Sequence, residues 1–271
     1  MSGLHEVFTR ARVEGRAALV GYLPSGFPTQ AEGIALAVAA VAAGVDIVEV
    51  GLPYSDPLMD GPVIQAAVHQ SLVAGSSVSH VFDTVAGVAA TGAPTLVMSY
   101  WNPIERIGVE PFASRLRAAG GIGVITPDLI PEEAADWCAA TDAAGIDRVF
   151  LVAPSSTDER IAGVAAVTSG FVYAASTMGV TGARSSVGSG ARALVARVRT
   201  ATDLPVAVGL GVSTGAQAAE VAEYADGVIV GSAFIARILA AADHAEALAS
   251  VSTLAQELAA GVRGQVATRQ R

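Results

Sequence analysis

The 271-residue sequence has one cysteine, no lysine, few aromatic residues and no surplus of positive charge. A single cysteine, Cys138, excludes an internal disulfide and a paired-thiol metal or redox site, which suits a reducing compartment. The net charge of −9, with no basic run, counts against nucleic acid or an anionic membrane as a partner. The first sixteen residues lack the apolar segment of a secretory signal, so we expect a cytoplasmic protein.

Long hydrophobic runs are also scarce. Residues 84–104 and 161–183 each run about 20 residues without a charge, which is the length that a membrane helix needs. Gly92 and Pro94 break the first run, and several Gly, Ser and Thr residues dilute the second. We therefore predict no membrane span.

The sequence is rich in short, branched apolar runs that alternate with Ala-rich stretches of helical spacing. Such alternation predicts βαβ units and a parallel sheet. Eight units in about 250 residues are typical of a (β/α)8 TIM barrel. We predict one barrel domain over residues 1–271, with an additional N-terminal helix at 4–13 and a last helix at 245–262. The eight predicted strands are 17–23, 45–50, 95–99, 123–126, 148–152, 170–173, 205–208 and 227–230.

One carboxylate interrupts the second apolar run, VDIVEVG, where Glu49 precedes Gly51. Burying an ionised carboxylate without a partner is costly, so Glu49 is either paired with a cation or has a raised pKa suited to proton transfer. Strand alternation places Ile47 and Glu49 on one face and Asp46 on the other. We interpret Asp46 as a solvated charge or one at the opposite end of the barrel.

A second carboxylate, Asp60, lies eleven residues later in LMDGPVIQ, directly before a helix that Pro62 would open. It has two interpretations: turn or capping chemistry, or a second acid at the mouth of the same barrel. Two carboxylates in different environments can divide acid and base roles.

Two predicted strands lead into glycine-rich loops, GLGVSTG and GSAF. Glycine lets backbone amides approach an anion, and a helix N-terminus adds a partial positive charge. Barrels often bind phosphate in the loops after strands 7 and 8, although ordinary turns are the alternative here. The predicted phosphate-binding residues are Gly209, Gly211, Gly231 and Ser232. The segment 174–190, rich in Gly, Ser and Thr, is interpreted as a lid.

Together these motifs resemble those of tryptophan synthase α subunits, over residues 16–262. The most specific are GYLPSGFP, VEVGLPYSDPLMDGPVIQ and GVTGAR, followed by the GLGV and GSA loops. The resemblance implies a carbon-carbon lyase that performs a retro-aldol cleavage of indole-3-glycerol phosphate to indole and D-glyceraldehyde 3-phosphate. Indole then passes to a β subunit, which makes L-tryptophan.

The resemblance also implies residue roles. Glu49 and Asp60 are the catalytic pair, supported by Tyr173. Glu49 protonates the indole ring and then deprotonates the adjacent glycerol hydroxyl, while Asp60 stabilises positive charge on the ring nitrogen. Gly182 joins the phosphate-binding residues, and Thr181 meets Asp60 on lid closure. The implied substrate-binding residues are Tyr22, Ile64, Tyr100, Phe171, Thr181, Gly182 and Leu210.

The implied partner is the β subunit of an α2β2 complex, which carries pyridoxal phosphate. The resemblance implies no cofactor in this chain, and we expect no metal. Trp101 could anchor the partner interface, with core packing as the alternative. The loops after the second and third strands would supply the contacts, namely Pro53, Tyr54, Asp56, Pro57, Trp101, Asn102 and Pro103.

Two other functions stay open at this point. The chain could be another phosphate-binding barrel, of the sugar-phosphate isomerase or indole-glycerol-phosphate synthase type. The synthase type needs a catalytic lysine at a strand end, which this sequence does not offer. Alternatively, the chain could be chiefly a regulatory subunit with little turnover of its own.

Overall fold

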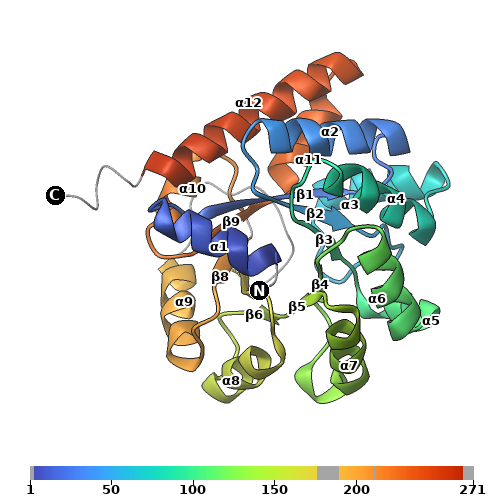
Figure 1. The fold of residues 1–271 in the computed structure, drawn as a ribbon. Helices are drawn as coiled ribbons and strands as arrows, with labels where there is room; N and C mark the ends of the chain where they lie inside the picture. Colours follow the sequence, from blue (N-terminus) through green and yellow to red (C-terminus); the bar gives the residue numbers. More distant parts are fainter. Residues whose placement is uncertain (1–2, 176–188, 210, 265–271) are drawn as a thin grey trace.

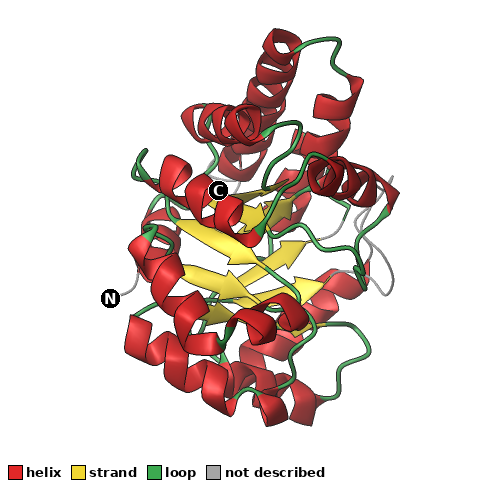
Figure 2. Cartoon of the chain, turned by 90° about the vertical axis from the view of Figure 1, so that its right-hand side faces the viewer, coloured by secondary structure: helices red, strands yellow, loops and turns green. Residues whose placement is uncertain are grey.

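The computed structural model describes residues 3–175, 189–209 and 211–264. Parallel strands form its centre and helices surround them (Figures 1 and 2). The strands are β1 (Ala18–Pro24), β2 (Ile47–Gly51), β3 (Thr95–Met98), β4 (Gly123–Ile125), β5 (Asp147–Val149), β6 (Leu151–Val152), β7 (Val172–Ala175), β8 (Val206–Gly209) and β9 (Gly227–Val230).

Helices precede, follow and alternate with the strands along the chain, except between β5 and β6. They are α1 (Gly3–Val13), α2 (Gln30–Ala42), α3 (Pro62–Val73), α4 (Val78–Ala89), α5 (Trp101–Ile107), α6 (Val109–Ala118), α7 (Ala135–Ala144), α8 (Asp158–Val167), α9 (Ser189–Ala201), α10 (Gly215–Ala222), α11 (Ser232–Ala240) and α12 (His244–Arg263), with a short 3-10 helix η1 (Pro131–Glu133). The predicted barrel with an additional N-terminal helix is confirmed.

The fifth predicted strand is divided at Phe150 into β5 and β6. All strand pairs are parallel, in the order β5-β4-β3-β2-β1-β9-β8-β7-β6. Since β5 pairs with β4 and β6 pairs with β7, one continuous segment joins both ends of this order. The two halves together act as the single fifth strand of an eight-stranded barrel.

Two apolar clusters hold the barrel together. The larger lies between the strands and the surrounding helices. The smaller fills the barrel interior with alternate strand residues such as Val20, Ile47 and Leu96. Helix α1 closes the amino end of this interior, because Phe8 packs on Phe171 with ring centroids 5.5 Å apart. Its Leu4 lies so close to Gly170 that a Cβ there would approach it to 2.8 Å.

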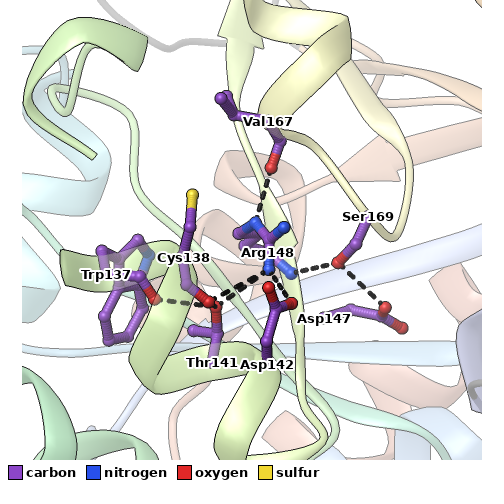
Figure 3. Close-up of polar contacts among 8 residues, drawn as sticks. All are labelled: Trp137, Cys138, Thr141, Asp142, Asp147, Arg148, Val167 and Ser169. Atoms are coloured by element: carbon purple, nitrogen blue, oxygen red, sulfur yellow. Dashed lines mark hydrogen bonds and ion pairs between the residues drawn. The ribbon is translucent and has the colours of Figure 1, made fainter. Parts of the chain in front are cut away.

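Polar contacts at the amino end are structural. Asp46 accepts two hydrogen bonds from Arg16, at 2.6 and 2.9 Å, and one from the Leu19 amide. Of the two predicted places for Asp46, the opposite end of the barrel is therefore the one observed. Arg148 of β5 donates to Thr141 of α7 and to the carbonyl of Val167 (Figure 3).

No single described helix is long and apolar enough to span a membrane. One sharply bent helix pair, α3 with α4, meets that criterion by length and composition. The uncharged run 84–104 crosses a helix, a strand and a second helix.

Candidate active site

A cavity opens at the carboxyl ends of the barrel strands. Apolar side chains form most of its wall, and a few polar groups converge on it. The lining residues are Tyr22, Glu49, Met59, Asp60, Ile64, Met98, Ile125, Pro127, Leu151, Tyr173, Gly211, Val212, Ile229, Gly231 and Ser232.

Glu49 reaches the cavity because β2 alternates. Ile47 lies in the interior cluster, so the side chain two residues later points the same way. Glu49 is only 3% exposed, and its Oε2 has no hydrogen-bond partner among the described residues. Burial, and then the nearby charge of Asp60, raises the pKa of Glu49 to about 8. Of the two predicted interpretations, this environment fits a proton-transfer group rather than an ion pair.

Asp60 comes from the loop before α3 and is also buried. Tyr100 donates its hydroxyl to Asp60 Oδ1 at 2.9 Å, and the Met59 amide donates to the same hydroxyl at 3.1 Å. Burial raises the pKa of Asp60, whereas the Tyr100 hydrogen bond lowers it. Helix α3 begins at Pro62, and its N-cap residue is Gly61, with no side-chain capping hydrogen bond. Capping therefore does not account for the Asp60 carboxylate.

Tyr22 and Tyr173 carry hydroxyl groups to the same cavity from β1 and β7. Burial, together with the neighbouring carboxylates, raises the pKa of both phenols well above 10, so both remain protonated donors. Each ring lies over a glycine on an adjacent strand. A Cβ would meet the Tyr22 hydroxyl at 2.4 Å if added to Gly51, and the Tyr173 hydroxyl at 2.1 Å if added to Gly209.

Three of the four predicted phosphate-loop residues line the cavity, namely Gly211, Gly231 and Ser232. Gly211 has φ +95°, a backbone conformation that favours glycine. Helix α11 begins at Ser232 without a side-chain cap, whereas Thr214 caps α10. Gly209 is absent from the lining, and its lack of a side chain makes room for Tyr173.

The remaining predicted substrate-binding residues fall into three groups. Ile64 lines the cavity, and Tyr100 lies behind Asp60 as its hydrogen-bond donor. Phe171 is not brought to the cavity, because it packs on Phe8 in the lower barrel interior. Thr181, Gly182 and Leu210 lie outside the described residues.

Sequence reasoning missed most of the apolar wall. Met98, Ile125, Leu151 and Ile229 are each the last inward-facing residue of a strand. Counting alternate residues to each strand's end would have found these four. Met59, Pro127 and Val212 lie in loops, where alternation gives no signal.

The predicted partner loops contact each other at the rim. Asn102 donates to the Tyr54 hydroxyl at 2.9 Å, and the Tyr54 and Tyr100 rings lie 5.6 Å apart. Trp101 is half-buried and packs edge-on against Trp137 at 5.8 Å. The rim loops are thus joined to Asp60 through Tyr100.

Comparison with known proteins agrees with this geometry. The family model described as tryptophan synthase alpha chain matches residues 8–263. The chain belongs to this family. It is 60% identical over 266 residues to the tryptophan synthase alpha chain of Thermobifida fusca, which covers 97% of this chain and 98% of the relative. The alpha chain of Mycobacteroides abscessus is 56% identical over 260 residues, covering 96% and 97%.

Solved structures give the same result. Tryptophan synthase of Mycobacterium tuberculosis matches with a TM-score of 0.91 and 52% identity, over 97% of this chain and 98% of the other. The alpha subunit of Legionella pneumophila matches with a TM-score of 0.87 at 29% identity, over 97% and 99%.

Family membership confirms several sequence predictions. The chain is the indole-3-glycerol-phosphate lyase component of tryptophan synthase, and it acts in tryptophan biosynthesis. An alpha chain carries no cofactor, and its partner is the beta subunit, which holds pyridoxal phosphate. The alternatives from other phosphate-binding barrel families are excluded.

Proposed function

We propose that Glu49 and Asp60 carry out the lyase reaction in this cavity, as proton shuttle and electrostatic stabiliser respectively. The observation that supports this division most directly is their unequal environment in one cavity. Glu49 has an unpartnered buried oxygen, whereas Asp60 accepts a hydrogen bond from Tyr100. A pair of acids with different surroundings can hold different protonation states at one pH.

Glu49 starts the reaction as an acid, because a pKa of about 8 leaves it mostly protonated at neutral pH. It delivers its proton to C3 of indole, which converts the ring to an indolenine-like cation. The resulting carboxylate then removes the proton from the hydroxyl on the adjacent chain carbon. As that carbon becomes an aldehyde, its bond to C3 breaks, the electron pair returns to the ring, and Glu49 is again protonated.

Asp60 acts on the opposite side of the ring system. Protonation at C3 places positive charge on the ring nitrogen, and a fixed carboxylate beside that nitrogen stabilises it. Tyr100 holds the Asp60 carboxylate in place and favours its ionised form. Tyr173 supports the site as a protonated donor near Glu49.

The phosphate would bind at the amino end of α11. Ser232 and Gly231 line the cavity there, and the uncapped helix end presents amide N–H groups and a partial positive charge. Gly211 adds a loop backbone on the adjoining side. We assign Thr181, Gly182 and Leu210 to substrate binding by family resemblance.

The partner surface is proposed to be the rim loops described above, within an α2β2 complex. Its residues are Pro53, Tyr54, Asp56, Pro57, Trp101, Asn102 and Pro103. Leu58, in the same loop, is 71% exposed and adds an apolar contact. We further propose that residues 1–271 form one domain and that the protein is cytoplasmic.

The decisive experiment measures indole release from indole-3-glycerol phosphate by the chain alone and then with its β subunit. We expect slow release by the chain alone and faster release by the complex. If the complex releases no indole while the β subunit still converts indole and serine to tryptophan, the proposed catalysis is wrong. The chain would then act as a regulatory subunit.

A further inference from the structure

Tyr22 spans the gap between two neighbouring strands at the cavity. Its Cα pairs laterally with that of Glu49 on β2. The Cβ end of the Tyr22 side chain lies against Gly231, where an added Cβ would meet Tyr22 Cβ at 3.3 Å and Cδ1 at 3.1 Å. The tip lies against Gly51, where an added Cβ would meet the hydroxyl at 2.4 Å. The absence of side chains at these two glycines leaves room for the ring.

The strand order places Tyr22 between the proposed phosphate site and Glu49. Strand β1 lies between β9, which leads to Gly231 and Ser232, and β2, which carries Glu49. A substrate whose phosphate binds at α11 and whose reacting carbon meets Glu49 must pass the Tyr22 side chain. The part of the substrate between those two points is the short hydroxylated carbon chain.

The hydroxyl of Tyr22 is suited to bind that chain. Tyr22 lines the cavity, and no hydrogen bond joins its hydroxyl to another residue that the structure describes. Asp60 Oδ1 is already bonded to Tyr100. Burial and the adjacent carboxylates keep the phenol protonated, which leaves one O–H donor available to a ligand.

We propose that the Tyr22 hydroxyl donates a hydrogen bond to the middle hydroxyl of the glycerol phosphate chain, the one that Glu49 does not deprotonate. Tyr22 would then do more than form part of the wall of the indole pocket. It makes Tyr22 a specificity-determining residue for polyol phosphates. This inference rests on the proposed function, because it uses the assigned positions of the phosphate and the reacting carbon.

The test compares two ligands in the Tyr22→Phe variant. Indole-3-glycerol phosphate has the chain hydroxyls, and indole-3-propanol phosphate has the same ring and phosphate without them. Loss of one neutral hydrogen bond should lower kcat/KM for the first about three- to tenfold. The inhibition constant of the second should stay within about twofold. Phenylalanine fits the same space, because it only removes the oxygen nearest Gly51.

A matched control is Tyr224→Phe, which removes a phenol hydroxyl near Arg192, outside the cavity. It should change neither constant. The proposal is overturned if Tyr22→Phe weakens both ligands equally, since that marks a packing role, or if it weakens neither. Assays use the full chain with its β subunit.

A second measurement separates this proposal from the proposed function. Calorimetry measures the affinities of the wild type and of Tyr22→Phe for glycerol 3-phosphate and for propyl phosphate. This measurement needs no turnover. Tyr22→Phe should reduce the preference for glycerol 3-phosphate about three- to tenfold. An unchanged preference overturns the role of Tyr22 even in an active enzyme. Conversely, if the wild-type complex releases no indole but Tyr22→Phe still reduces the preference for glycerol 3-phosphate, only the proposed assignment of Glu49 and Asp60 is rejected.

Discussion

Glu49 and Asp60 share a cavity yet differ in their immediate surroundings. Burial raises the pKa of both, and only Asp60 has a phenol that counteracts this effect. The single hydrogen bond from Tyr100 at 2.9 Å therefore distinguishes the two acids. It also links Asp60 to the rim, because Tyr100 contacts Tyr54.

Replacing Asp60 with Asn should nearly abolish cleavage, by about 10²-fold or more, because a neutral amide does not stabilise the developing ring cation. Affinity for glyceraldehyde 3-phosphate should stay almost unchanged, since the phosphate site lies at α11. Steady-state indole release and calorimetry measure the two quantities. A large loss of glyceraldehyde 3-phosphate affinity would instead identify Asp60 as a scaffold residue.

Glu49→Gln should abolish turnover and raise stability above neutral pH. The pKa of Glu49 is about 8 in the folded protein and near 4.5 when unfolded. Between these values the unfolded chain ionises first, so wild-type stability falls as pH rises, by at most about 1.4 kcal/mol per pH unit. Denaturant titrations of wild type and variant should diverge from about pH 4.5 and run parallel above about 8. Parallel stabilities throughout would contradict the raised pKa.

The same pKa predicts the activity profile. In the proposed mechanism Glu49 begins the cycle protonated, so kcat/KM should decline as pH rises through about 8, the pKa of Glu49 in the free chain. Initial rates of indole release by the complex, measured from pH 6 to about 9.5, test this. A rate that increases steadily through that range would show that the reaction starts from the carboxylate.

At the scale of elements, a tyrosine near the end of one strand packs over a glycine on the neighbouring strand. Tyr173 on β7 projects over Gly209 on β8, just as Tyr22 on β1 projects over Gly51 on β2. In each case the tyrosine sits two residues below the glycine in register, since Tyr173 pairs with Ala207 and Tyr22 with Glu49. Glycine at these positions serves the neighbouring tyrosine.

Gly209→Ala should therefore displace Tyr173, lowering both stability, by about 1–3 kcal/mol, and turnover. The loss of stability should shrink in a Tyr173→Ala background, which a double-mutant cycle of urea unfolding would measure. Gly163→Ala in α8 is the matched control, because nothing lies within 4 Å of its added Cβ. It should be neutral or stabilising. Equal losses in both backgrounds would rule out the contact.

Sequence patterns predicted the strands well, because short branched runs bounded by glycine have few other structures available. They did not single out α5 and α6, since Pro103 and Gly108 lie within WNPIERIGVEP and favour a loop. In the structure Pro103 lies early in α5, where its missing N–H costs nothing, and Gly108 separates the two helices with φ +95°.

Site residues were predictable where a residue type departs from what its strand or turn would ordinarily contain. Glu49 in an apolar strand and glycines before a helix are such departures, and both reach the cavity. Phe171 shows the limit, because the depth of a residue along the barrel axis depends on strand stagger. It lies on the inner face but packs low, on Phe8. Position along that axis is not encoded in alternation alone.

For the whole molecule, the two ends of the barrel have separate tasks. The amino end holds α1 and the Arg16–Asp46 pair, whereas the carboxyl end holds the cavity. Phe8→Ala should therefore cost about 3–5 kcal/mol of stability and leave kcat within about twofold at a temperature where the variant is folded. Thermal unfolding and indole release test this. Comparable damage to kcat would show that the floor of the barrel positions the catalytic groups.

The closure of that floor also determines the route of the product. In the proposed mechanism indole forms beside Glu49, above the packed side chains of Phe171 and Phe8, so we expect it to leave across the same rim that admits the substrate. A protein docked on that rim intercepts indole before it reaches bulk water. Because the amino end of the barrel is closed by packed side chains, the product can be delivered only toward the partner at the carboxyl end.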